Sequence, residues 1–222
     1  MKKALLFAAV VSLSAFTSFS ANAQFGGLPG VGAKTGSSSS ASAGDVDAFL
    51  KTADEADGLI RKSASTLFSA VATKQQIDAQ EDVLKAANAV ADPKEKEAAI
   101  KKASDDQLAQ LAKVDYAAKS EEMKKSMDAK KSKQIGASIY NFTLGMLKDK
   151  EVMDKGQGVI ASISSNPMAA GKLVKAKDVV SSVTGQMGSI STIAVGIQKL
   201  MTVAKLEALP TKTTDQPKPF AD

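Results

Sequence analysis

The stretch that decides the fold class is a run of 20 residues without a charge, Val179–Gln198, with the sequence VVSSVTGQMGSISTIAVGIQ. Apolar residues recur through and beyond this run at alternating steps of three and four: Leu173, Ala176, Val180, Val183, Met187, Ile190, Ala194, Ile197, Met201 and Ala204. This heptad seam predicts one continuous α-helix over Pro167–Leu206, roughly 60 Å long at a rise of about 1.5 Å per residue.

The other faces of this helix are apolar or small in its central part, with glycines at Gly185 and Gly196. A helix of this kind is normally buried by neighbouring helices or by lipid. Two further stretches with apolar helical stripes, Asp45–Val71 and Ile135–Met153, are expected to cover it. Gly145 in the second stretch is expected to allow a close helix contact. We therefore predict an all-α fold, an elongated helical bundle of long amphipathic helices.

The N-terminus has the features of a bacterial secretory signal peptide over residues 1–23. Lys2 and Lys3 precede a short apolar segment, and Ala21-Asn22-Ala23 forms a small-x-small cleavage site after Ala23. Residues 24–44 are rich in Gly and Ser and are expected to form a flexible linker. The predicted location is therefore the periplasm or the outside of the cell.

The helical bundle domain is predicted to span residues 45–209, followed by a disordered Pro-rich tail at 210–222. Asp92-Pro93 is expected to start a helix, because Asp is a good N-cap and Pro suits the first helical turn. Ser104-Asp105-Asp106 repeats a helix-start signal, which predicts a short helix over Pro93–Ala103 and a second helix after it.

Missing residue types exclude several classes of chemistry. The sequence has no cysteine and no histidine, so disulfides, Cys nucleophiles, structural zinc sites and His-based triads are excluded. It contains no phosphate-binding Gly-Lys loop, no dinucleotide motif and no Gly-x-Ser-x-Gly elbow. Acidic pairs such as Asp105-Asp106 are adjacent, and neighbouring side chains on a helix point about 100° apart. We expect no enzymatic activity, no cofactor and no metal.

The charge balance argues against nucleic acid as a partner. Without Lys2 and Lys3, 27 of the 29 basic residues remain against 24 acidic ones, a net charge of +3. Arg61 is the only arginine, so bidentate recognition of phosphates is not expected.

Residues 119–133 are lysine-rich and carry the first candidate contact surface. The residues assigned to anionic groups, on a membrane or on lipopolysaccharide, are Lys124, Lys125, Lys130 and Lys131. The alternative is that they form the solvated face of one long helix.

Three interpretations of the uncharged helix remain open. The first is an exported, non-enzymatic helical protein of the cell envelope that binds a protein partner or a membrane surface. The second is a membrane-active protein, similar in architecture to helical pore-forming proteins, that conditionally exposes Val179–Gln198. The third is a self-assembling structural protein, a homo-oligomer that buries the seam between copies. The candidate contacts to lipid or to a partner helix are Val183, Ile190 and Ile197.

Overall fold

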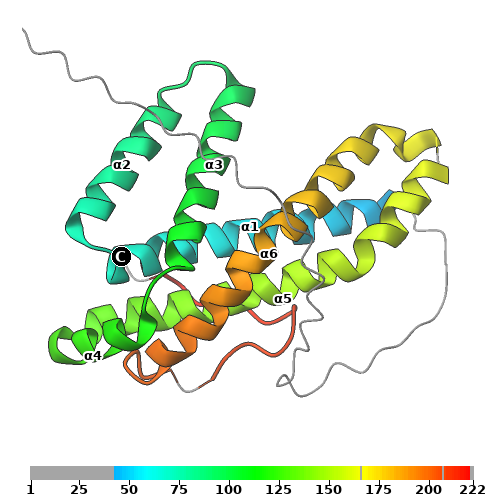
Figure 1. The fold of residues 1–222 in the computed structure, drawn as a ribbon. Coiled ribbons are helices and arrows are strands. Elements are labelled where there is room, and N and C mark those ends of the chain that lie inside the picture. The colour runs from blue at the N-terminus through cyan, green and yellow to red at the C-terminus, as the bar shows by residue number, and fades with distance from the viewer. Residues whose placement is uncertain (1–42, 166, 207, 221–222) are drawn as a thin grey trace, which may run out of the picture. The chain divides into compact units, whose positions relative to one another are not determined.

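The computed structural model describes residues 43–165, 167–206 and 208–220, so the predicted signal peptide and nearly all of the predicted linker lie outside the described residues. The described part is helical and contains no strand, which confirms the all-α prediction (Figure 1). The elements are α1 Ala43–Val71, α2 Lys74–Asn88, α3 Pro93–Leu111, α4 Tyr116–Ser126, α5 Ala129–Ser165, the 3-10 helix η1 Pro167–Lys172, and α6 Leu173–Met201.

Side-chain caps set several helix starts. Thr73 and Gln76 form a reciprocal capping box at the start of α2. The Asp92 carboxylate accepts hydrogen bonds from the first turn of α3, with Pro93 at the first helical position as predicted. Asp115 caps α4 in the same way. These short polar side chains satisfy backbone N–H groups that have no partner inside the helix.

The predicted break after Ala103 is wrong, because α3 continues through it to Leu111. The Ser104 hydroxyl donates back to the Ile100 carbonyl of the preceding turn instead of capping a new helix. The Asp106 side chain pairs with Lys102 on the same helix, at 2.7 Å.

Two predicted long helices are shorter than the sequence pattern indicated. The lysine-rich stretch 119–133 is divided at Met127, whose backbone is extended, and Asp128 accepts a hydrogen bond from the Lys131 N–H in the first turn of α5. The seam helix predicted over Pro167–Leu206 is α-helical only from Leu173 to Met201. It begins after a 3-10 turn and ends in a turn where Lys205 has a φ of +49°.

Helices α1 and α5 form the most extensive packing pair and run in opposite directions (Figure 1). Gly145 lies where their backbones approach each other. A Cβ on Gly145 would lie 2.7 Å from Ile60 Cγ1 and 3.1 Å from the Ala56 carbonyl oxygen. The predicted role of Gly145 as a close-contact residue is therefore confirmed.

The core consists of two apolar clusters. The larger joins the second half of α1, the first half of α5 and the second half of α6 with residues of α3 and α4. The smaller joins the first half of α1, the second half of α5 and the first half of α6. Helix α2 packs on α3, where the Gln80 amide donates to the Ala103 carbonyl, and the two form a hairpin (Figure 1).

Residues 210–222 were predicted to be a disordered tail, but the described part of this tail, 210–220, makes defined contacts with the helices. The Asn141 side chain on α5 donates to the Lys218 carbonyl at 2.7 Å and accepts from the Lys218 N–H at 2.8 Å. Lys62 on α1 lies 4.5 Å from the centre of the Phe220 ring. The buried Asn141 amide on α5 thus satisfies both backbone hydrogen-bonding groups of Lys218.

Candidate functional surface

The basic surface forms where α4, α5 and the end of α6 meet. An open hollow of about 1030 Å³ lies there, and four lysines border it: Lys124, Lys130, Lys133 and Lys205. Lys124 comes from the last turn of α4, Lys130 and Lys133 from the start of α5, and Lys205 from the turn that follows α6. Three segments of the chain therefore contribute positive charge to one concave surface, which we call the lysine hollow.

Buried hydrogen bonds fix this junction. The Ser132 hydroxyl donates to the Ala204 carbonyl at 3.0 Å, and the Ser120 hydroxyl donates to the Lys199 carbonyl at 3.1 Å. The Lys199 carbonyl lies in the last turn of α6 and the Ala204 carbonyl in the turn that follows it, so these bonds tie α4 and α5 to the end of α6. The lysines of the hollow thus project from a rigid base.

The hollow is strongly unbalanced in charge. Asp128 is the single acidic residue among the described residues that line it. Its carboxylate is shared with Lys131, whose ammonium lies 4.0 Å away and which lines a different hollow. Lys124 is paired with Glu121 at 2.5 Å, and both side chains are largely exposed, so this pair is weak. The lysines can therefore attract an anionic group.

Two of the four lysines predicted to contact anionic groups lie in this hollow, Lys124 and Lys130. Lys131 borders a separate hollow of about 480 Å³ together with Met123 and Phe220. Lys125 is exposed and lines neither hollow.

The three predicted lipid or partner-helix contacts lie in the core. Val183 is 8% exposed, Ile190 is 0% exposed and Ile197 is 1% exposed. Val183 belongs to the smaller apolar cluster, and Ile190 and Ile197 belong to the larger one. Their neighbours are helices of the same chain, so the seam is covered in this structure. Across the described residues, we find no helix with the length and apolar character that crossing a membrane requires.

A second region of polar side chains was not found from the sequence. Asp149 on α5 is 2% exposed and lies between the two apolar clusters. Burial, with a smaller contribution from the negative charge of Asp57, raises the pKa of the Asp149 carboxyl to about 7. The sequence held one signal for it. The apolar stripe of this helix includes Met146 and Met153, which are two helical turns apart. Asp149 lies between them at a position where the spacing of three to four residues would place an apolar side chain.

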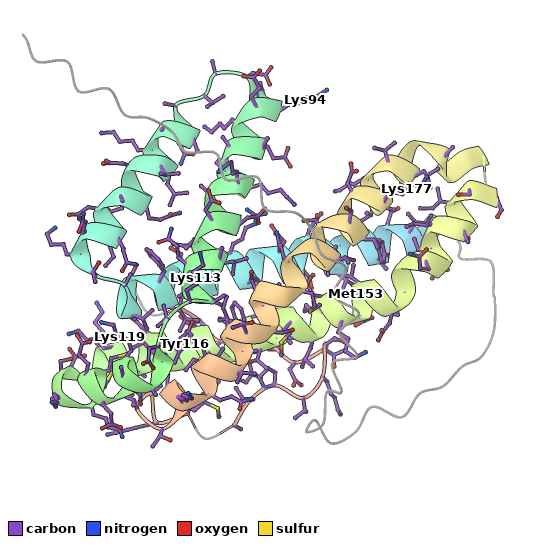
Figure 2. The ribbon with its side chains drawn as sticks, viewed as in Figure 1. Lys94, Lys113, Tyr116, Lys119, Met153 and Lys177 are labelled. Atoms are coloured by element: carbon purple, nitrogen blue, oxygen red, sulfur yellow. The ribbon has the colours of Figure 1, made fainter. Side chains whose placement is uncertain are left out.

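Tyr116, labelled in Figure 2, begins α4 and packs its ring against Gly196 of α6. A Cβ at Gly196 would lie 2.5 Å from Tyr116 Cε2, so only glycine leaves room for the ring. Burial raises the pKa of the Tyr116 hydroxyl well above its usual range. This tyrosine is a core residue that fixes α4 on α6.

No group of acidic residues able to hold a metal ion is found in the part of the chain that the structure describes. Comparison with family models, with curated proteins and with solved structures gives no match to this chain.

Proposed function

We propose that this chain is an exported, non-enzymatic helical protein of the bacterial cell envelope that binds an anionic membrane surface through the lysine hollow. The observation that carries the proposal is the convergence of Lys124, Lys130, Lys133 and Lys205 around one concave surface that has a single carboxylate. The ligand chemistry is the phosphate group of a lipid or lipopolysaccharide headgroup.

The residue type fits a membrane better than a defined small ligand. Lysine acts as a mobile point charge on a flexible stem, so a set of lysines can follow headgroups that differ in position. A nucleic acid or a single phosphate ligand would favour the planar fork of arginine, and the only arginine, Arg61, pairs with Asp57 elsewhere. The partly buried Met127 at the border adds an apolar contact at the level of the headgroups.

The proposed location agrees with this chemistry. A signal peptide removed after Ala23 would deliver residues 24–222 to a compartment bounded by anionic lipid and lipopolysaccharide. The strength of the contact can be estimated, because each lysine near an anionic surface contributes about 1 kcal/mol. Four lysines then correspond to about 4 kcal/mol, roughly a hundredfold to a thousandfold in partitioning.

The test is flotation of the purified protein with vesicles of phosphatidylcholine alone and with vesicles that contain phosphatidylglycerol. We expect binding only to the anionic vesicles, and we expect it to weaken as salt is added. A variant with glutamine at Lys124, Lys130, Lys133 and Lys205 should lose this binding.

The matched control places glutamine at four exposed lysines outside the hollow: Lys85, Lys94, Lys113 and Lys177. Three of them, Lys94, Lys113 and Lys177, are labelled in Figure 2, which shows Lys94 near the tip of the α2–α3 hairpin. The control removes the same net charge and should keep most of the binding. Equal losses in the two variants would mean that overall charge, and not the hollow, attracts the protein. Absence of binding by the unchanged protein would reject a membrane surface and leave a protein partner.

A further inference from the structure

A polar cleft lies beside the smaller apolar cluster, whose Ala53, Val179 and Val183 form part of its lining. It has a volume of about 300 Å³ and lies among α1, α3, α5 and α6. Its lining contains five acidic and three basic residues, which are Asp54, Asp57, Glu97, Asp149, Asp178, Arg61, Lys101 and Lys175. Asp149 is the one acidic residue of this set that is almost completely buried.

The basic residues of the cleft are engaged away from Asp149. Arg61 Nε lies 2.6 Å from the Asp57 carboxylate, with which it forms an ion pair along α1. Lys175 Nζ lies 3.4 Å from the Asp54 carboxylate. Lys101 on α3 donates a hydrogen bond to the Ser182 hydroxyl on α6. Each cation of the cleft therefore has a partner other than the buried carboxylate.

Asp149 itself has no hydrogen-bond donor among the residues that the structure describes. A buried carboxylate without a donor is unfavourable by several kcal/mol unless it binds a proton or a positively charged group. The negative charge of Asp57 makes the ionised form of Asp149 less favourable still. A positive group beside Asp149 would therefore favour its ionised form.

We infer that this cleft binds a small organic cation, with a primary ammonium group of the ligand donating hydrogen bonds to the Asp149 carboxylate. The excess of acidic over basic residues in the lining favours a positive ligand. The carboxylates of Asp178 and Glu97, which line the same cleft, supply a second place for positive charge.

The size and composition of the cleft narrow the ligand class. A volume of about 300 Å³ is at the small end of ligand pockets, so a short aliphatic diamine suits it better than a large molecule. A metal ion suits it less, because no three acidic side chains in the described part of the chain are arranged to hold one. An ammonium group needs only one charged acceptor with hydrogen-bonding geometry and can use serine and amide oxygens for its remaining donors.

Binding should be linked to proton release from Asp149. An ammonium group competes with the proton for the same oxygens, so affinity follows the ionised fraction of this carboxyl. With the pKa near 7, that fraction is about 30-fold larger at pH 8 than at pH 5.5.

The test is isothermal titration calorimetry of the purified chain with putrescine, in phosphate buffer of constant ionic strength at pH 8 and at pH 5.5. We expect binding at pH 8 that weakens about 30-fold at pH 5.5. Asp149→Asn should weaken binding at pH 8 at least tenfold and remove most of the pH dependence. The control Asp154→Asn changes an exposed carboxylate of the same helix and should bind as the unchanged protein does.

The outcomes that overturn the inference are distinct. No binding of putrescine by the unchanged chain at millimolar concentration would overturn it, and so would equal binding by Asp149→Asn. Butane-1,4-diol, which has the same chain length and no charge, should not bind. Asp149→Asn removes a buried charge and is expected to fold, which circular dichroism checks before titration. The lysine-hollow variant should bind putrescine normally, because its substitutions lie outside this cleft.

Discussion

Replacing Asp149 by asparagine should stabilise the protein at neutral and alkaline pH. The pKa of this carboxyl rises from an unfolded value near 3.8 to about 7 in the folded chain. A raised acid pKa means that the folded state holds the proton more tightly, so stability falls as the pH rises from about 4 to about 7. Each pKa unit corresponds to about 1.36 kcal/mol, which puts the full effect at about 4 kcal/mol. Between pH 5 and pH 8 this group alone should remove about 2.5 kcal/mol of stability.

Asparagine has nearly the same shape and does not titrate, so it removes this loss. The assay is urea unfolding at pH 5 and at pH 8, followed by circular dichroism, for the unchanged protein, Asp149→Asn and the control Asp154→Asn. The stabilisation by Asp149→Asn should be about 1.5 kcal/mol at pH 5 and about 4 kcal/mol at pH 8. The control Asp154→Asn removes an exposed carboxylate from the same helix, so the difference between the two variants reports the effect of burial at Asp149. A variant that is less stable than the unchanged protein at pH 8 would refute the reasoning, since the carboxylate would then have a stabilising partner.

Two further predictions concern packing and the C-terminal segment. Gly145→Ala should destabilise the protein by about 1–2 kcal/mol in urea unfolding, because overpacking against α1 exceeds the gain in helix propensity. Gly58→Ala, whose Cβ meets nothing within 4 Å, should instead stabilise it by up to about 1 kcal/mol. Asn141→Ala should release the segment around Lys218 and speed tryptic cleavage after Lys212 severalfold, with the helical content unchanged. Equal cleavage rates would mean that other contacts hold this segment.

The sequence predicted those parts of the structure that depend on local chemistry. The heptad seam, the Asp92-Pro93 helix start and the close contact at Gly145 follow from periodicity, capping and side-chain size within short windows. The false break at Ser104 shows the limit of such signals, because the same hydroxyl can cap a helix or bond to the preceding turn. Contacts with residues elsewhere in the chain determine whether the hydroxyl caps a new helix or bonds to the preceding turn.

The candidate sites depended on tertiary structure and were found only in part. Lys124 and Lys130 could be read from a lysine-rich run, whereas Lys205 joins them only because the end of α6 lies on the start of α5. Asp149 was one of many carboxylates in the sequence. Its burial depends on how α1, α5 and α6 pack into two separate apolar clusters. No local sequence pattern encodes that packing.

The polar residues of the uncharged helix bear on whether α6 could leave the fold and enter a membrane. Ser182 and Gln186 lower the hydrophobicity of Val179–Gln198, and both form hydrogen bonds with side chains of α3. Ser182 accepts from Lys101, and the Gln186 amide donates to the Asp105 carboxylate at 2.6 Å. Releasing α6 into lipid would break these bonds and leave amide and hydroxyl groups in hydrocarbon, where each unpaired group is unfavourable by several kcal/mol. Binding through the lysine hollow needs no such rearrangement, because its lysines already project from the surface. For the membrane contact that we propose, surface binding by the folded chain is therefore energetically more favourable than exposure of α6.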